Sequence, residues 1–386
     1  MSSTWGTNIK ISIFGESHSK GIGVVIDGIP AGTRLDPERL LHFLARRSSR
    51  GGKLDTPRIE KDFPQIISGL LPDEGHPGYM IACGTPVCAL IENGNTQSKD
   101  YEQLRAVARP GHADYTGFVR YHGCNDIRGG GHFSGRLTAP LCFAGGIAKQ
   151  YLRGFGIEVG AHIASIGSVQ DKPFDPVLIE PDTLLAVQEK FFPVLDDKAG
   201  ERMQKLIEHC RDQLDSVGGV IECAIAGVPA GIGDPMFDCV ESKISSLLFG
   251  IPAVKGVEFG LGFGLSSLQG SQANDPFYIR ENAASSKEVL TVTNHNGGIL
   301  GGITDGMPVI FRAAIKPTPS IAQKQRTVNF KTGENVELSI TGRHDPCIVR
   351  RAVPCIESAA AIALMDLMLG SDLVPKNPSR KGGSTR

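Results

Sequence analysis

Alternating apolar and polar residues predict strands at several points along the chain. Residues 9–14 alternate in this way and run into a Gly-Glu-Ser-His segment. Residues 220–226 also alternate, and residues 24–26, 254–259 and 309–315 are predicted to be strands as well. Successive side chains of a strand point to opposite faces, which produces this two-residue period.

Apolar residues at helical spacing predict helices between these strands. The best-marked helix follows Asp36, because aspartate suits the N-cap and Pro37 suits the first helical position. This helix is expected to end near Arg46 and Arg47, just before a Gly-Gly pair. The other predicted helices span residues 143–152, 201–214, 240–248 and 353–369. Gly370 is expected to cap the last of these.

The order of the elements indicates one compact α+β unit. We find no linker of distinct composition, no internal repeat and no low-complexity tract. The expected domain spans residues 1–370, and the polar residues 371–386 are expected to form a disordered tail. Residues 93–136 are rich in Gly, His and Arg and predict long ordered loops.

The composition is that of a globular protein with many glycines. The 386 residues include 48 glycines, and 40 basic residues nearly balance 41 acidic ones. This near-neutral charge argues against a nucleic-acid-binding protein. Glycines scattered through apolar sequence indicate tight turns and close approach of the backbone to a ligand.

Cysteine usage and the N-terminus exclude several classes of protein. The nine cysteines include no C-x-x-C pair and the ten histidines are dispersed, so neither a disulfide framework nor a metal site is expected. The first twelve residues lack the apolar core of a signal peptide, and no apolar run approaches the ~18 residues of a membrane span. A cytoplasmic protein without membrane contact is the simplest expectation.

Two candidate sites lie near the N-terminus. Ser17 and His18 follow a strand, where they could serve as nucleophile and base, but the segment lacks the last glycine of a G-x-S-x-G elbow. The alternative is a structural histidine whose hydrogen bonds are satisfied within the turn. Residues 34–58 hold seven basic and three acidic residues. This excess of positive charge could bind an anionic ligand. Equally, it is typical of a solvated helix end.

Two further candidates lie later in the chain. Residues 109–136 contain three consecutive glycines at 129–131, which suit a backbone nest for an anion although no P-loop pattern is present. Residues 343–347 read Arg-His-Asp-Pro-Cys and are followed by two more arginines. This cluster is either a surface ion network or part of a site.

Taken together, these segments resemble the chorismate synthase family. The matching motifs, in the family's order and over nearly the whole chain, are Gly15-Glu16-Ser17-His18, residues 109–114, 294–302 and 316–320, and Arg343-His344-Asp345-Pro346. The resemblance implies a layered α+β fold, with helices between antiparallel sheets, and a homotetramer. It also implies an anti 1,4-elimination of phosphate from the small molecule 5-enolpyruvylshikimate 3-phosphate, giving chorismate in the shikimate pathway. The family's reaction depends on reduced FMN, for which NADPH can be the ultimate reductant.

The resemblance further implies roles for individual residues. His18 would act as general acid toward the leaving phosphate, His112 would protonate or hydrogen-bond the reduced flavin, and Asp345 would help relay a proton from flavin N5. The implied substrate-binding residues are Arg47, Lys53, Ser134, Arg136 and Arg343. The implied FMN-binding residues are Ser134, Pro252, Ala253, Gly301, Lys316, Pro317, Thr318, Pro319, Ser320 and Arg343.

Two parts of the chain depart from the family pattern. Lys53 stands where the family usually has arginine, so the charge is kept but the bidentate fork is lost. Residues 132–138 read His-Phe-Ser-Gly-Arg-Leu-Thr, where Arg-Ser-Ser-Ala-Arg-Glu-Thr is usual. At 132 and 133 the resemblance therefore leaves only backbone contacts with FMN.

Alternatives to a synthase stay open at this point. One is a flavin- or anion-binding protein that has lost turnover, and the other is a phosphate-ester hydrolase that uses Ser17 and His18. The source of reduced flavin is also open. Since no separate reductase motif is visible, an external reductant is favoured.

Overall fold

The computed structural model describes residues 3–49, 51, 54–55, 62–94, 106–281, 287–340 and 345–377. Lys53 and Arg343, two of the implied substrate-binding residues, lie outside the described residues. The expected tail also lies outside them from residue 378 onward. Its first part packs on the body: Asn377 Nδ2 donates to the carbonyl oxygen of Ala31 at 2.8 Å, and Tyr151 Oη donates to that of Lys376 at 3.0 Å.

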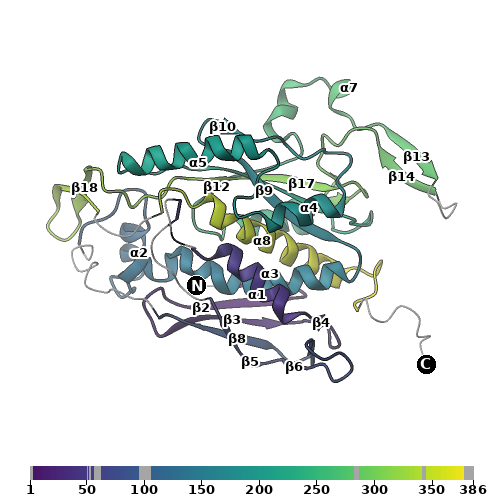
Figure 1. The fold of residues 1–386 in the computed structure, drawn as a ribbon, viewed down its shortest axis with the longest axis horizontal. Coiled ribbons are helices and arrows are strands. Elements are labelled where there is room, and N and C mark those ends of the chain that lie inside the picture. The colour runs from purple at the N-terminus through teal and green to yellow at the C-terminus, as the bar shows by residue number, and fades with distance from the viewer. Residues whose placement is uncertain are drawn as a thin grey trace.

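Helices lie between two five-stranded antiparallel sheets (Figure 1), as the predicted layered α+β class requires. The first sheet contains, in spatial order, β1 (Thr4–Trp5), β2 (Lys10–Gly15), β3 (Gly21–Asp27), β8 (Val87–Glu92) and β5 (Pro64–Ser68). The second contains β10 (Val169–Gln170), β9 (Glu158–Ile166), β11 (Gly219–Ala226), β17 (Val309–Ile315) and β12 (Val254–Phe259). Neighbouring strands in both sheets pair antiparallel. The predicted fold class is confirmed.

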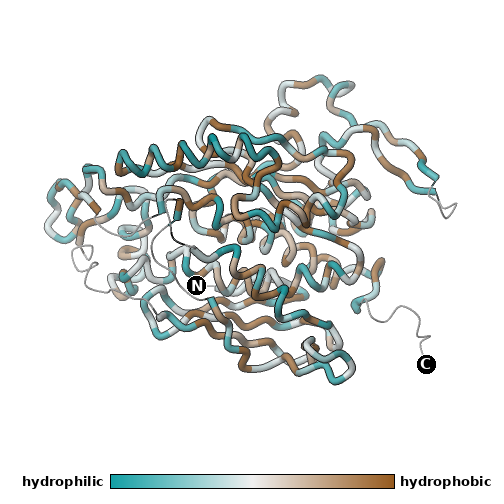
Figure 2. Tube along the Cα trace, in the orientation of Figure 1, coloured by the Kyte–Doolittle hydropathy of each residue, from teal (hydrophilic) through white to brown (hydrophobic). Residues whose placement is uncertain are grey.

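The layer between the sheets includes helices α1 (Pro37–Arg47), α3 (Thr138–Arg153) and α8 (Val349–Gly370). One hydrophobic cluster joins residues of all three helices to residues of both sheets. Figure 2 shows brown, apolar segments through this layer and along the facing strands. Burial of this shared apolar surface is the main force that holds the layers together.

The remaining elements are short or peripheral. The helices are α2 (Asp114–Arg120), α4 (Pro181–Glu189), α5 (Asp197–Asp212), α6 (Val240–Leu248) and α7 (Gly270–Ala273), with 3-10 turns at Arg128–Phe133, Gly135–Leu137, Met236–Asp238 and Gly262–Ser267. The strands are β4 (Arg34–Leu35), β6 (Leu70–Pro72), β7 (Met80–Ala82), β13 (Phe277–Glu281), β14 (Lys287–Thr291), β15 (Ile299–Leu300), β16 (Ile303–Thr304), β18 (Gln325–Asn329) and β19 (Glu334–Leu338).

Helix α1 begins and ends where the sequence predicts. The Asp36 side chain accepts hydrogen bonds from the backbone N–H groups of Glu38 and Arg39, at 2.9 and 3.2 Å. These bonds satisfy donors that have no partner within the helix. The backbone becomes extended at Ser48, so the helix ends at Arg47, whose side chain is buried.

Helix α8 differs from its prediction at both ends. It begins at Val349 instead of residue 353, includes Pro354, and ends in a cap at Ser371 rather than at Gly370. Gly370 is still helical, and a Cβ there would lie 2.6 Å from Asn8 Nδ2. The glycine therefore permits close packing and does not form a left-handed cap.

By length and composition α8 could cross a membrane. All of its apolar stretch is buried inside the protein, between the two sheets. A helix that is apolar on all sides is also what the core of a globular protein requires.

A buried histidine links two strands of the second sheet. His162 Nδ1 lies 3.0 Å from Asp171 Oδ2, and His162 Nε2 lies 2.9 Å from Glu222 Oε2. Burial alone would lower the pKa of His162 because it disfavours the charged imidazole. The hydrogen bonds to the two carboxylates outweigh burial, so the pKa of His162 is raised.

Raising the pH is therefore expected to weaken the fold through His162. Its stabilising contribution is complete below the unfolded pKa of 6.5 and is lost as the pH rises through the higher folded pKa. Urea unfolding of the wild type and of His162→Gln between pH 6 and 9 measures this effect. The wild type should lose stability more steeply than the variant, and equal slopes would contradict the assignment.

Candidate active site

Three consecutive glycines lie between two histidines. Gly129, Gly130 and Gly131 have φ values of 60°, 84° and 55°, a region that favours glycine. A Cβ on Gly129 would lie 2.3 Å from the His18 ring, and one on Gly130 would lie 3.2 Å from His112 Nε2. The glycine segment therefore allows both imidazoles to approach the same stretch of backbone, one at each residue.

His18 lies in the turn that follows β2. Its residue is 7% exposed, and the preceding Ser17 is fully buried. The Ser17 amide donates to the carbonyl of Gly131 at 3.2 Å, which ties this turn to the glycine segment. Asn93, just after β8, donates from Nδ2 to the carbonyl oxygens of Glu16 and Ser19, both at 3.0 Å. The turn that carries His18 is thus held by the backbone of Gly131 and by the side chain of Asn93.

Two predicted substrate-binding arginines meet at a buried carboxylate. Arg47 Nε donates to Asp62 Oδ2 at 3.0 Å, and Arg136 Nη1 donates to Asp62 Oδ1. Burial alone would raise the pKa of Asp62, but the two guanidinium groups hold it well below its usual range. Arg136 Nε also donates to Asn93 Oδ1 at 3.1 Å. Asn93 therefore connects the arginine pair to the His18 turn.

His112 is oriented by a buried ion pair. Asp114 accepts from Arg109 Nη2 at 2.7 Å, and its Oδ1 lies 2.8 Å from His112 Nδ1. Burial would raise the pKa of Asp114, whereas hydrogen bonds from Arg109 and His112 lower it below its usual range. Because the carboxylate is ionised, it accepts a hydrogen bond from Nδ1–H and leaves Nε2 facing Gly130.

The expected FMN segment at residues 316–320 packs against the His112 loop. Lys316 Nζ donates to the carbonyl of Gly111, and Arg109 Nη1 donates to Ser320 Oγ at 3.4 Å. The Lys316 amide donates to the carbonyl of Ala253 at 2.9 Å, which brings residues 252–253 to the same place.

Two of the expected FMN residues have features that a ligand would explain. The Oγ1 atom of Thr318 is buried and has no hydrogen-bond partner among the described residues. Ala253 has a φ of 76°, an uncommon left-handed conformation for a residue with a Cβ. Gly301 lies elsewhere: the adjacent Gly302 accepts from the Val240 amide at the start of α6, whereas Ala253 follows the end of that helix.

Ser134 and Asp345 lie next to this arrangement. Ser134 Oγ accepts from the Arg136 amide at 3.3 Å, and its Cβ would be 3.7 Å from a Cβ on Gly130. Asp345 accepts from Arg351 Nη1 at 2.7 Å, and Arg351 Nε donates to the carbonyl of Arg47 at 3.0 Å. Arg351 thus connects Asp345 to Arg47, at the end of the site where the arginines lie.

His132 and Phe133, two of the residues that depart from the family pattern, have structural partners. His132 Nδ1 lies 2.8 Å from the carbonyl of Gly15, and His132 Nε2 lies 2.9 Å from Ser3 Oγ. The Phe133 ring packs near Tyr121, with 6.1 Å between ring centroids. These contacts tie the loop to the end of β2, to Ser3 and to the residue that follows α2.

The basic segment at residues 34–58 contributes one arginine to this network. Among its described cations, Arg34, Arg39 and Arg46 pair with Asp73, Asp36 and Glu357, respectively. Only Arg47, through Asp62, joins the group that includes His18. The excess of charge in the sequence therefore overstates the number of cations that the described residues bring to the site.

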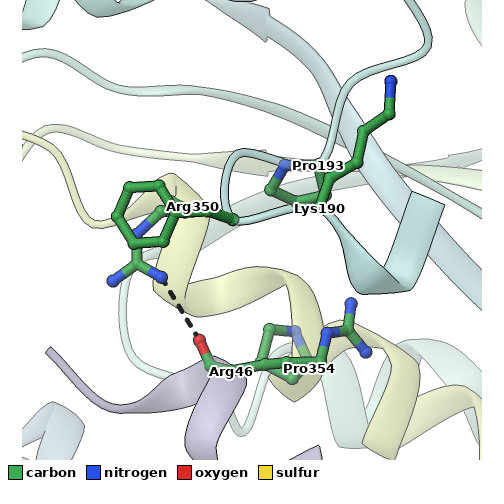
Figure 3. A pocket seen from close by; sticks show the side chains of 6 residues that line it. Arg46, Lys190, Pro193, Arg350 and Pro354 are labelled. Atoms are coloured by element: carbon green, nitrogen blue, oxygen red, sulfur yellow. Dashed lines mark hydrogen bonds between the residues drawn. The ribbon is translucent and has the colours of Figure 1, made fainter. Parts of the chain in front are cut away.

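Another basic pocket lies beside α8 (Figure 3). Arg46, Lys190 and Arg350 line it, and Arg350 Nη1 donates to the carbonyl of Arg46 at 3.4 Å. The three cations are already paired, with Glu357, Asp197 and Asp55 in turn. This pocket therefore has no evident need for an anionic ligand.

Sequence reasoning gave no role to four residues that organise the site. Arg109 and Asp114 lie in a motif that was recognised, but their pairing with His112 depends on a turn between them. Asp62 and Asn93 lie outside every motif, and their partners are 14 to 77 residues away in the chain. A signal was present in the buried strand that ends at residue 92, because the polar residue after such a strand often faces a functional loop.

Comparison with known proteins gives consistent matches. The family model for chorismate synthase matches residues 9–369. A chorismate synthase of Lancefieldella parvula is 45% identical over 378 residues, which cover 95% of this chain and 96% of the relative. One of Thermococcus kodakarensis is 44% identical, covering 94% and 97% of the two chains.

A solved structure supports the same relationship. The crystal structure of a chorismate synthase matches with a TM-score of 0.70 and 27% identity, covering 95% of this chain and 93% of that one. The sequence and structural matches both extend over almost the whole chain. The chain therefore belongs to the chorismate synthase family, lyases of the shikimate pathway that act on carbon–oxygen bonds.

Proposed function

We propose that this protein converts 5-enolpyruvylshikimate 3-phosphate to chorismate by an anti 1,4-elimination, with reduced FMN as cofactor. The observation that carries the proposal is the placement of two histidines at adjacent glycines, His18 at Gly129 and His112 at Gly130. One histidine is connected to the arginine pair and the other to the Lys316–Ser320 segment. A site of this kind can hold two different anionic ligands next to each other.

The residues expected to hold FMN suit that group. Thr318 has a buried hydroxyl without a partner among the described residues, and the Lys316 amide donates to the carbonyl of Ala253 at 2.9 Å, which brings two of the expected segments together. The proposed FMN-binding residues are Ser134, Pro252, Ala253, Gly301, Lys316, Pro317, Thr318, Pro319, Ser320 and Arg343. Reduced FMN, when bound, supplies electron density that assists the departure of phosphate.

The arginines complement the negative charge of the substrate. The substrate carries one phosphate and two carboxylates, and guanidinium groups bind such anions through paired N–H donors. Arg47 and Arg136 are nearly buried, so water competes little for these donors. We propose that they bind the substrate together with Lys53, Ser134 and Arg343.

The histidines and Asp345 would handle protons. In the elimination the carbon–oxygen bond to phosphate breaks, a hydrogen leaves another ring carbon, and a second ring double bond forms. His18 would donate a proton to the leaving phosphate, and His112 would present Nε2 to the flavin while Asp114 holds Nδ1. Asp345 would help pass on the proton that is removed.

We further propose that the protein is a homotetramer in the cytoplasm. The β13–β14 hairpin projects from the body (Figure 1) and exposes apolar side chains, with Phe277, Ile279 and Val289 at least 59% exposed. Apolar side chains gathered on a projecting hairpin support contact with further copies of the chain. Light scattering of the purified protein would measure the assembly.

An anaerobic assay tests the proposed activity. The protein is supplied with chemically reduced FMN and 5-enolpyruvylshikimate 3-phosphate, and chorismate absorbance and free phosphate are followed. Formation of chorismate supports the synthase. Phosphate without chorismate would indicate a hydrolase, and neither product would indicate a binding protein. Repeating the assay with NADPH and oxidised FMN shows whether the chain reduces its own flavin, and we expect that it does not.

Replacing Arg47 by Ala is expected to weaken substrate binding far more than FMN binding. The guanidinium of Arg47 contacts Asp62 and lies near Thr138, whereas no contact joins it to residues 316–320 among the described residues. Loss of a charge-assisted partner should raise the dissociation constant of the substrate by about tenfold or more. Separate titrations of the two ligands measure this, and equal losses would place Arg47 outside the substrate site.

A further inference from the structure

Asp62 is a buried carboxylate shared by two arginines. Its side chain is 1% exposed, and those of Arg47 and Arg136 are 3% and 4% exposed. One carboxylate oxygen accepts from Arg47 and the other from Arg136. Ser48 Oγ also donates to it, at 2.8 Å. The two guanidinium groups are thus brought together around one negative charge.

The helical layer contains a second buried carboxylate that is bound by two cations, but its surroundings differ from those of Asp62. Glu357 accepts from Arg46 at 2.8 Å and from Lys149 at 2.5 Å, and it is fully buried. The Ala161 amide donates to the same carboxylate at 3.2 Å, so Glu357 ties α1, α3 and α8 to β9. Glu357 therefore has a structural role at the centre of the protein.

The arginines that bind Asp62 connect it to the candidate active site. Arg136 donates to Asn93, which holds the turn of His18. Arg47 and Arg136 are also the arginines proposed to bind the substrate. The N–H donors that face Asp62 are the kind that a phosphate or carboxylate of the substrate would use.

We infer that Asp62 is an internal counter-ion of the substrate site, which holds Arg47 and Arg136 in place and competes with anionic ligands for them. The inference rests on the proposed function for the identity of the ligand. Two guanidinium groups and one carboxylate have a net charge of about +1, whereas the arginines alone would have about +2. The lower charge limits the affinity for anions and so favours the release of phosphate after each turnover.

Asp62→Asn tests the inference because it keeps the shape of the side chain and removes its charge. We expect flavin-free Asp62→Asn protein to bind inorganic phosphate about tenfold more tightly than the wild type in calorimetric titrations. In turnover, both KM and kcat should fall, because the substrate binds more tightly and phosphate leaves more slowly. Purely structural damage would raise KM instead. Unchanged or weaker phosphate binding would overturn the inference.

Glu357→Gln is the matched control, since it also removes one buried carboxylate from two cations. We expect it to lower the thermal midpoint without any gain in phosphate affinity. The midpoint of Asp62→Asn should fall too, but added phosphate should restore it. A gain in phosphate affinity of the same size in Glu357→Gln would overturn the inference, because the effect would then not belong to the site.

Arg47→Gln provides a second test that does not depend on the folding of Asp62→Asn. This variant leaves a neutral pair of Arg136 and Asp62, and phosphate affinity should fall about tenfold or more. Retention of wild-type affinity would overturn the inference. The proposed function is tested separately, because a wild type that makes no chorismate would refute it without changing the phosphate titrations.

Discussion

Replacing His18 or His112 by Ala is expected to reduce kcat by about 10²- to 10⁴-fold, the usual loss when a general acid or base is removed. Both side chains approach the glycine segment, and neither belongs to the hydrophobic core. The fold should therefore survive both changes. Rates in the anaerobic assay and thermal unfolding midpoints measure the two effects independently.

The two variants should also differ from each other. His112 lies in the loop that packs against Lys316, so His112→Ala should alter the spectrum or affinity of reduced FMN. His18→Ala should leave flavin binding close to that of the wild type. His209, which is exposed on α5, provides a control whose replacement should not affect turnover. Near wild-type rates in both active-site variants would remove the histidines from the mechanism.

Gly129→Ala is expected to abolish most activity although it adds a single methyl group. A Cβ at this position would lie 2.3 Å from the His18 ring, so the imidazole must move. The φ of 60° also costs about 1–2 kcal/mol for a residue other than glycine. A loss of kcat of about 10²-fold or more is expected, since misplacement of a catalytic group by about 1 Å can have an effect of that size.

Gly156→Ala separates the cost of the left-handed backbone from the displacement of His18. Gly156 has a φ of 81°, and a Cβ there would meet no atom within 4 Å. Both variants should lose stability in urea unfolding because of the left-handed backbone, with a larger loss in Gly129→Ala since its Cβ also meets His18 and Ser17, but only Gly129→Ala should lose turnover. If both kept wild-type kcat, the glycine segment would not be what positions His18.

The local elements could be predicted from the sequence because their signals are local. Asp36 and Pro37 mark the start of α1, and the bounds of α6 and β12 agree with the predicted ranges. Gly370 shows the limit of such signals. The same residue type serves as a left-handed cap or allows close packing, and only the position of Asn8 decides between them.

The arrangement of the layers could not be derived in this way. Pairing between β11 and β17 joins residues more than 80 positions apart, and no period in the sequence specifies such a partner. The layered class came from resemblance to a family. The layered class agrees with the structure, in which α8 provides the apolar centre that both sheets cover.

The motifs of the site could be predicted from the sequence, but the side-chain contacts that connect them could not. His18, His112, Arg47 and Arg136 were all identified, but Asp62 and Asn93, which join the turn of His18 to the two arginines, were not. Buried polar groups require partners, yet the sequence does not say which distant residue supplies one. Lys53 and Arg343 remain predictions, since they lie outside the described residues.

The most direct test of the proposed function is the number of turnovers per flavin. Wild-type protein with substoichiometric reduced FMN is mixed anaerobically with excess 5-enolpyruvylshikimate 3-phosphate, and chorismate and phosphate are quantified together. We predict equal amounts of the two products, at many turnovers per flavin, with the flavin still reduced at the end. Phosphate without chorismate, or product that never exceeds the flavin, would contradict the proposal.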